Sequence, residues 1–413
     1  MERPLALELG HWAATRASSG GDRELADAAL LDTVCVALAA REHPIAEIAG
    51  VLGSPGQWAA MAHALDYDDL HLPSISHISA ICVPAALARA GGSAAYLAGA
   101  GVMARIGTLL GWRHYDAGWH TTATAGVFGA AAAAAVSLGL SAERTAAAIA
   151  LSVSAASGVQ RAFGSDAKPL QVGMAVRSGI AAAELAARGA RPDLTAFDAW
   201  LDLVSPSGGD AMDGTEAIPG GLAVKIFPCC YALQRPIFAV REICRGRRIA
   251  PEAVLGAEVR APVSTVKPLI HHRPTDGAQG KFSLEYGVAA ALLDGFPDQW
   301  SFSDVAVRRP AAQELLPRVR FLSGEPGRGL LDGECEIALE LAGGDVLQAA
   351  IDVPEGAPGR PPSPGVLAEK AAGCLSGLDL AVSDIDWGSA AALLAAHAPT
   401  AMLAELKREG DVG

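Results

Sequence analysis

The chain has 413 residues, of which 51% are hydrophobic and 5% aromatic, enough for one large core or two packed domains. Its formal net charge is −13, so nucleic acid and anionic membrane surfaces are unfavourable partners and we expect neither. An anionic substrate is compatible with this charge only if the protein holds a local basic pocket.

The cysteines and one uncharged segment bear on where the protein resides. The seven cysteines are odd in number and show no CxxC or Cys/His ligand spacing, so we expect reduced thiols in a cytoplasmic protein without a signal peptide. Residues Thr121 to Leu140 carry no charge and are about long enough to span a bilayer. Because they are mostly Ala, Gly and Thr, we expect instead a helix that is buried on all sides.

The first 222 residues read as one helix after another. Residues Arg23 to Ala40 place apolar side chains near one face, and residues Leu170 to Ala187 continue the helical pattern. Ser141 is a typical N-cap, and Gly189 fits a C-terminal stop. Alanine, which has the highest helix propensity and little bulk, favours closely packed helices here.

The pattern changes after about Lys225. Apolar and polar residues alternate as in half-buried strands within 256–263, 318–322, 335–341 and 346–353, around a helical run from Leu284 to Asp294. A linker rich in Pro and Gly, residues 354–364, precedes helical patterns near 366–375 and 389–396. We therefore predict a helical domain from residues 1–222, a smaller α/β domain from 223–359, and a return to the helical domain over 360–413.

Two polar clusters are candidates for chemistry. The segment DYDDLHLPSISH runs from Asp66 to His77; it is either a solvated turn that caps the next helix or a metal site, although its spacing matches no compact ligand motif. The segment RHYDAGWHTT contains Arg113, Tyr115 and His120 just before the apolar helix. A helix N-terminus there would suit a substrate carboxylate, whereas the alternative is simple capping with a structural His120.

Basic and hydroxyl groups mark three further segments. Lys168 is an isolated lysine between two apolar helices; such a residue is usually a surface charge. The segment KIFPCC carries Lys225 and Cys230, and KFSLEY carries Lys281 and Tyr286. Packing explains the apolar residues of these segments, so only the basic and hydroxyl groups call for a function.

Together these segments resemble the MmgE/PrpD family, which includes 2-methylcitrate dehydratase, cis-aconitate decarboxylase and iminodisuccinate epimerase. The matching pieces occur in family order between residues 64 and 295: ALDYDD followed by His77, YDAGWHTTATAGVFGAAAAA, KPLQVGMAVRSGIAAAELAARG, KIFPCC and KFSLEYGVAAALLDG. The resemblance implies a mainly α fold, with a large all-helical domain built from both chain ends and a smaller α/β lid domain. It also implies a homodimer, a site between the domains, and catalysis without metal or organic cofactor.

The resemblance also assigns residues. The positions that the family uses for catalysis correspond here to Asp66, His77, His120, Lys168, Lys225 and Tyr286, while Tyr115 stands where epimerase-like members have a tyrosine. Three positions depart from the pattern: Leu70 replaces a common threonine, and Cys230 and Gln234 replace histidines of the decarboxylases. These departures weigh against cis-aconitate decarboxylation.

The chemistry that these residues permit is removal of a proton next to a carboxylate. Lys168 and Lys225 would stabilise the developing negative charge, and His120, Tyr115 and His77 are the available acids and bases. Arg113, Lys225, Cys230 and Lys281 are expected to bind a small di- or tricarboxylate. We predict a hydro-lyase, with an epimerase or isomerase as the close alternative and a decarboxylase or a non-catalytic carboxylate-binding protein as less favoured ones.

Overall fold

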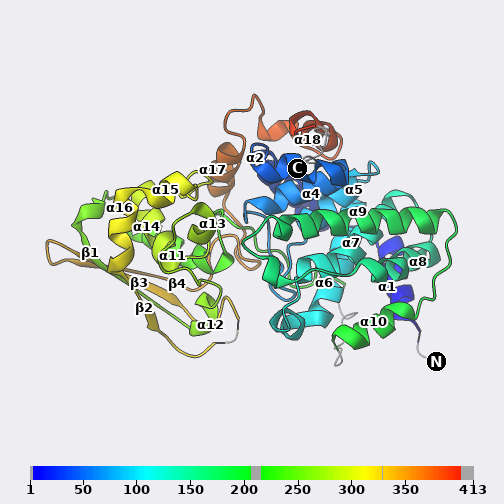
Figure 1. The fold of residues 1–413 in the computed structure, drawn as a ribbon, viewed down its shortest axis with the longest axis horizontal. Helices are drawn as coiled ribbons and strands as arrows, with labels where there is room; N and C mark the ends of the chain where they lie inside the picture. Colours follow the sequence, from blue (N-terminus) through cyan, green and yellow to red (C-terminus); the bar gives the residue numbers. More distant parts are fainter. Residues whose placement is uncertain (1–2, 206–214, 328, 401–413) are drawn as a thin grey trace, which may run out of the picture.

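The computed structural model describes residues 3–205, 215–327 and 329–400. Two groups of elements lie side by side along the long axis of the molecule: helices α1 to α10 in one, and a sheet with helices α11 to α16 in the other (Figure 1). Each group has its own hydrophobic core, and the first core also takes in residues near the C-terminus.

The first group consists of helices that pack around one buried helix. They are α1 (Leu5–Thr15), α2 (Gly20–Ala39), α3 (Pro44–Ile48), α4 (Ser54–Ala64), α5 (Ser79–Leu87), α6 (Ser93–Asp116), α7 (Thr121–Ser137), α8 (Ala142–Ser152), α9 (Ala167–Ala187) and α10 (Ala196–Val204). Helix α7 is buried from Thr121 to Ala135 and packs against α5, α6, α8 and α9, which confirms the prediction from its uncharged sequence. Ser141 caps α8 as predicted, since its side chain accepts a hydrogen bond from the Arg144 backbone N–H.

The second group is built on a four-stranded mixed sheet of order β2-β1-β3-β4, in which β1 is parallel to β2 and antiparallel to β3. Its strands are β1 (Val254–Ala261), β2 (Val319–Ser323), β3 (Cys335–Leu341) and β4 (Val346–Ile351). Its helices are α11 (Gln234–Ile243), α12 (Val263–Val266), α13 (Gly277–Gly280), α14 (Leu284–Asp294), α15 (Asp304–Arg308) and α16 (Pro310–Leu315). The alternation seen in the sequence buries Val259, Ile337 and Leu339 in the core that α11 and α14 share.

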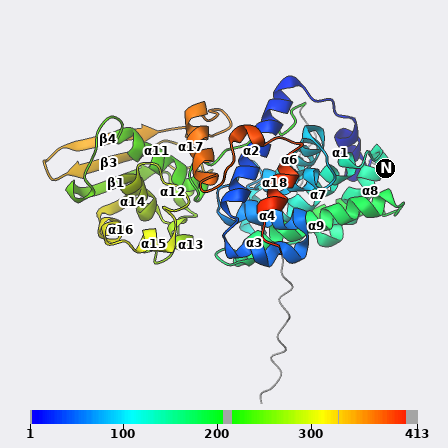
Figure 2. The same ribbon diagram turned by 90° about the horizontal axis from the view of Figure 1, so that it is seen from above.

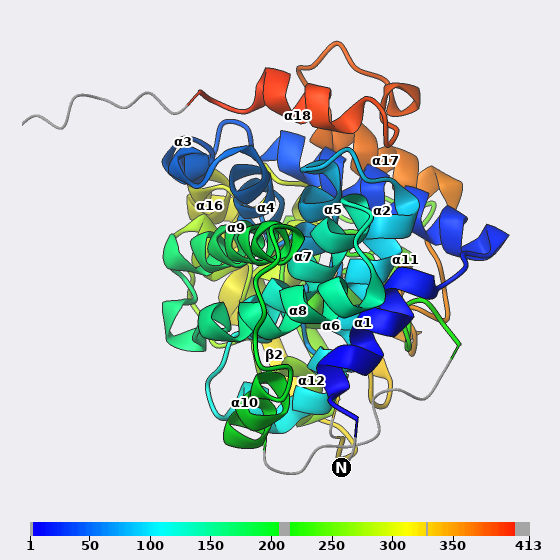
Figure 3. The same cartoon turned by 90° about the vertical axis from the view of Figure 1, so that its right-hand side faces the viewer.

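The C-terminal helices return to the first group. Helices α17 (Pro364–Cys374) and α18 (Ala390–His397) both pack against α2, and Figure 3 shows them on the same side of the helical group. Helix α17 lies between α2 and the sheet group (Figures 1 and 2). Lys370 of α17 is buried and forms an ion pair with Asp32 of α2 at 2.5 Å. Its ammonium also donates hydrogen bonds to the backbone carbonyls of Tyr67 and Lys225, which ties the C-terminal segment to the region of the candidate site.

The predicted fold class, a mainly α protein with a large all-helical domain and an α/β lid, is wrong. The structure is a helix-rich fold in which a four-stranded mixed sheet has a hydrophobic core of its own. The first group is not all helical either, because the chain between α4 and α5 consists mostly of turns and bends and takes part in the isolated bridges Leu70–Ala223 and His71–Ser76. The sequence did not predict these bridges, because each joins only single residues and short polar segments have no hydrophobic periodicity. The predicted domain boundaries stay a prediction.

One helix of the described residues is long and apolar enough to cross a membrane. It is α6, and 78% of its most apolar stretch is buried inside the protein. A mostly buried helix of this kind is what the core of a folded domain contains, so its apolar character is explained by packing.

Candidate active site

Two lysines meet one carboxylate where the two groups of elements adjoin. Asp66, just after α4, accepts a hydrogen bond from Lys168 Nζ of α9 at 2.9 Å, and its other oxygen lies 3.2 Å from Lys225 Nζ. Burial alone would raise the pKa of Asp66, but the two ammonium groups hold it well below its usual value. The carboxylate is therefore ionised and the cluster keeps excess positive charge.

The backbone around Asp66 is shaped to make this contact. Asp66 has a positive φ of 56°, a left-handed conformation that few residues other than Gly and Asn/Asp adopt readily. Four residues later, Leu70 and Ala223 exchange two backbone hydrogen bonds of 2.8 Å, which holds the segment after α4 beside the segment that leads into Lys225. Leu70, which replaces the family's threonine, packs against Ala223 and Tyr231 and so has a structural role.

Lys281 adds a third ammonium group. It follows α13, and its Nζ donates a hydrogen bond of 2.6 Å to the Leu65 backbone carbonyl, next to Asp66. Burial, together with the charge of Lys168, lowers the pKa of Lys281 to about 8, and Asp66 opposes this effect. Lys225 behaves differently: burial would lower its pKa, but the direct contact with Asp66 raises it. The site thus presents ammonium groups of unequal acidity around a single carboxylate.

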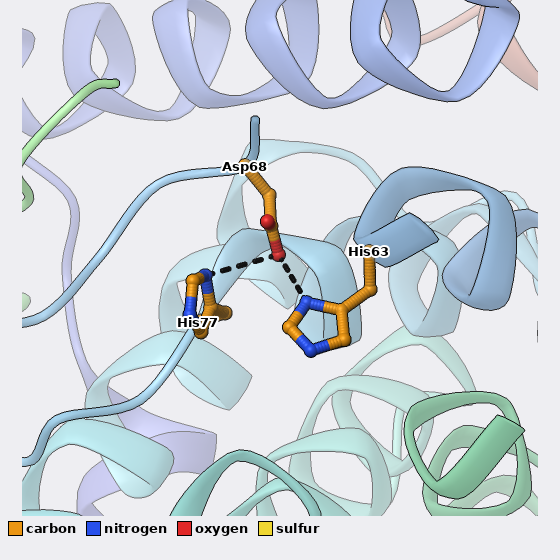
Figure 4. A group of neighbouring side chains, drawn as sticks. All are labelled: His63, Asp68 and His77. Carbon is orange, nitrogen blue, oxygen red and sulfur yellow. Dashed lines mark hydrogen bonds and ion pairs between the residues drawn. The ribbon is translucent and has the colours of Figure 1, made fainter. Parts of the chain in front are cut away.

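A second carboxylate lies between two imidazoles. Asp68 Oδ2 is 2.7 Å from His63 Nδ1 and 3.1 Å from His77 Nδ1 (Figure 4). The side chains of His63 and Asp68 are almost fully buried, and His63 and His77 hold the pKa of Asp68 well below its usual value although burial alone would raise it. An ionised carboxylate can only accept, so this arrangement favours a proton on the Nδ1 atom of each histidine.

The same three residues are the group among the described residues whose ligand atoms could hold a metal ion. Their side-chain atoms lie within 4.8 Å of one another. Two imidazoles and one carboxylate are a ligand set that transition metals accept. However, both ring nitrogens converge on one oxygen of Asp68 at hydrogen-bond or ion-pair distance (Figure 4), so the observed geometry is that of a histidine–aspartate–histidine cluster.

His120 is the residue just before α7 and lies beside this cluster. Its ring stacks on His63 with centroids 5.6 Å apart and touches the edge of Phe163. Its side chain does not cap α7; instead Nδ1 lies 2.9 Å from Gln171 Oε1 of α9. Burial first, and then the neighbouring His63, hold the pKa of His120 well below its usual value, so the ring is neutral near neutral pH.

A cavity of about 520 Å³ leads to the ion cluster. Asp66, Lys168 and His63 line it from the helical group, and Lys281 and Trp300 line it from the sheet group. In the part of the chain that the structure describes, His77 and His120 do not line this cavity. Both contact the ring of His63, which does line it.

The remaining predicted site residues fall into two sets. Tyr115 is half-buried near the end of α6 and lies close enough to Cys230 and Asp66 to feel their charges. Burial, followed by these charges, raises the pKa of Tyr115 to about 12. Cys230 is buried, its backbone N–H donates to the Lys281 carbonyl at 3.0 Å, and burial raises its pKa to about 11.

Arg113 and Tyr286 lie elsewhere, one at the surface and the other in the core of the sheet group. Arg113 is exposed in the last turn of α6. Tyr286 is buried in the core of the sheet group, where its ring packs on Phe302 and its hydroxyl donates to the Ser301 carbonyl. The catalytic role predicted for Tyr286 and the binding role predicted for Arg113 stay predictions.

The sequence did not predict the residues that hold the site residues in place through hydrogen bonds and ion pairs. His63 belongs to a helix that reads as apolar, and its only sequence signal is the aspartate five residues later. Gln171, three residues after Lys168, gave no signal because an amide within a helix is ordinary. Gln234 was noted only as a departure, yet its side chain accepts from the Ile226 and Phe227 backbone N–H groups and donates to the Phe227 carbonyl. It thereby fixes the turn that follows Lys225.

Comparisons with known proteins identify the family of the chain. Residues 57–200 match the MmgE/PrpD N-terminal domain, and residues 227–380 match the MmgE/PrpD C-terminal domain. The chain is 27% identical over 241 residues to cis-aconitate decarboxylase of Homo sapiens and 27% identical over 240 residues to that of Mus musculus, in each case over 55% of this chain. It spans about half the length of these curated relatives, 50% and 49%. With both domains of the family matched in order, the chain belongs to the MmgE/PrpD family.

Proposed function

We propose that this protein is a lyase that removes a proton next to a carboxylate of a small di- or tricarboxylic acid and expels water from the neighbouring carbon. The observation that carries the proposal is a neutral histidine, His120, beside a buried cluster in which Lys168, Lys225 and Lys281 face a single carboxylate, Asp66. A base of this kind takes protons near neutral pH, and excess positive charge stabilises the carbanion that forms.

The proposed reaction uses the described groups as follows. The substrate carboxylate binds at the ammonium groups of Lys168 and Lys281, which line the cavity. Nε2 of His120 takes the proton from the adjacent carbon, and the C–H electron pair forms a C=C bond. The hydroxyl on the next carbon leaves as water after it receives a proton from His77 or Tyr115. Each group then exchanges one proton with solvent: His120 releases the proton that it gained, and the acid regains the proton that it gave, which balances the reaction without a metal or organic cofactor.

An epimerase is the second candidate, and one observation favours it. His77 and His120 both contact the ring of His63, with centroid distances of 4.7 Å and 5.6 Å, so two further imidazoles lie next to a residue that lines the cavity. One could remove a proton and the other could return it to the opposite face. In that case the hydroxyl, or an equivalent substituent, stays on the substrate.

Decarboxylation is less favoured although the named relatives are cis-aconitate decarboxylases. Those relatives support a polycarboxylate as substrate. Where the decarboxylases carry histidines, this chain has Cys230 and Gln234. Burial raises the pKa of the Cys230 thiol to about 11 and so keeps it protonated. The Gln234 amide makes hydrogen bonds with the backbone of Ile226 and Phe227. Neither side chain can replace an imidazole as an acid or base near neutral pH.

The test is incubation of the protein with a panel of di- and tricarboxylates in deuterated water, with products followed by NMR. Loss of water from one substrate supports the proposal. Deuterium incorporation with inversion and no water loss assigns the epimerase instead, and release of carbon dioxide assigns a decarboxylase. If no substrate exchanges its proton or changes, the proposed function is wrong.

A further inference from the structure

Helix α9 supplies two polar side chains to the site, three residues apart. Lys168 reaches Asp66, while Gln171 reaches His120. Residues at this spacing lie on the same face of a helix, so one turn of α9 holds both the ion cluster and the base. The lysine contact is an ion pair; the glutamine contact involves a neutral amide, and what it contributes depends on which of its ends faces the imidazole.

The amide orientation follows from its other hydrogen bond. Gln171 Nε2 donates to the Val159 backbone carbonyl at 3.3 Å, and Oε1 lies 2.9 Å from His120 Nδ1. A flipped amide would set Oε1 against the Val159 carbonyl, which has no proton to offer, and would lose this bond. The amide nitrogen therefore faces Val159 and the amide oxygen faces the ring of His120.

The loop that supplies Val159 is fixed against the same two side chains. The His120 backbone N–H donates to the Gly158 carbonyl at 3.0 Å. Gly158 has a φ of 116°, and a Cβ atom at this position would lie 2.9 Å from Gln171 Oε1 and 2.7 Å from Ala123 Cβ. Only glycine lets the loop approach this closely, so backbone, amide and imidazole form one packed unit.

An acceptor at Nδ1 decides the tautomer of a neutral imidazole. Because Oε1 can only accept, Nδ1 of His120 carries the proton and Nε2 carries the lone pair. Among the described residues, the structure gives Nε2 of His120 no hydrogen-bond partner. The other groups that face the ring are His63 of α4, His77 of the segment before α5, Lys168 of α9 and the ring of Phe163. None of these is an anion, and the neighbouring carboxylates of Asp68 and Asp66 contact His63, His77 and Lys168 instead of His120.

We propose that Gln171 is a positioning residue whose amide holds His120 in the Nδ1–H tautomer and so presents Nε2 to the substrate. That Nε2 is the base rests on the proposed function; that the ring is held in this tautomer does not. A neutral amide fixes the tautomer without adding a negative charge beside the ring. A carboxylate at this position would favour the imidazolium form, and a protonated ring cannot take a proton from a substrate.

The direct test is NMR of the wild-type protein with ¹⁵N-labelled imidazoles, in which a His120→Gln variant identifies the His120 resonances. The proposal expects the Nδ1–H tautomer for His120 in the wild type. The Gln171→Leu variant, which lacks the acceptor, should lose this preference. A wild-type His120 in the Nε2–H form overturns the proposal, as does an unchanged tautomer in Gln171→Leu.

A kinetic test separates positioning from mere packing. In Gln171→Glu, a negative acceptor should raise the pKa of His120, so the acidic limb of kcat/KM should move to higher pH by about one unit or more. Gln313→Glu is the matched control, because Gln313 also donates its amide to backbone carbonyls but lies in the sheet group, within α16. An acidic limb that stays in place in Gln171→Glu contradicts the proposal. If no carboxylate is turned over at all, the proposed function is wrong. The NMR experiment still tests the tautomer of His120, because it requires no turnover.

Discussion

Lys168 and Asp66 form a buried ion pair of 2.9 Å in which each charge depends on the other. A lysine between apolar helices is costly unless an anion meets it, and here the protein supplies that anion itself. Because Lys225 contacts the second oxygen of the same carboxylate, Asp66 stays neutralised when one lysine is removed. This arrangement separates the effect of Lys168 on catalysis from its effect on stability.

Lys168→Met should therefore lower kcat/KM by about two orders of magnitude or more, while the melting temperature changes little, since electrostatic groups aimed at developing charge contribute on this scale. Steady-state kinetics and thermal denaturation measure the two effects. Lys267→Met is the control, because Lys267 is exposed and its ion pair with Asp116, at 3.5 Å, is a surface contact of little energetic weight. A normal kcat/KM in Lys168→Met would refute the role of this residue.

The alkaline side of the pH profile should report Lys281. Its pKa is lowered to about 8, so its ammonium is charged below this pH and neutral above it. If the charge binds the substrate, kcat/KM should fall as the pH rises through about 8. Lys281→Arg keeps a positive charge at every accessible pH, because guanidinium does not deprotonate, and should move this decline to higher pH. A decline that stays near pH 8 in a folded Lys281→Arg variant argues against the assignment.

Cys230 should not act as a nucleophile. Burial keeps its thiol protonated with a pKa of about 11, and a protonated thiol is a poor nucleophile. Cys230→Ser should keep most of the activity, because serine preserves the size of the side chain and the backbone hydrogen bond to Lys281. Loss of turnover when Cys230 is alkylated, under conditions that leave substrate binding intact, would reverse this conclusion.

Catalysis should survive removal of metal ions. In the cluster of His63, Asp68 and His77 the acceptor oxygen of Asp68 already faces two ring nitrogens, which accounts for its charge without a cation. We expect full activity after exhaustive treatment with EDTA and no gain on adding divalent ions. Activity that is lost on chelation and restored by one particular ion would instead assign this cluster as a metal centre.

The sequence predicted individual elements better than their assembly. The range of β3, Cys335–Leu341, and that of α14, Leu284–Asp294, match the prediction, because alternation and helical periodicity are local properties. The fold class was wrong because the sheet builds a core of its own, which depends on how α11 and α14 pack against Ile337 and Leu339. Local patterns carry no information about such packing.

The site shows the same limit. Motifs identified Asp66, Lys168 and Lys225, which the structure brings together across more than 150 residues of chain. They did not identify Gln171, because its function depends on the orientation of one amide. Nor did they predict that the Tyr286 hydroxyl binds the Ser301 carbonyl, since the path of the chain after α14 decides this contact.

The central claim, that His120 removes the substrate proton, is tested most directly by solvent exchange. The wild type and the His120→Asn variant are each given the substrate that the panel identifies, in deuterated water, and both the exchange of the proton next to the carboxylate and kcat are measured. Since the His120 side chain does not cap α7, the variant should keep its melting temperature but lose about two to four orders of magnitude in kcat and exchange. Near-normal exchange with a lowered melting temperature would show that His120 is structural, and the proton chemistry would then belong to Tyr115 or His77.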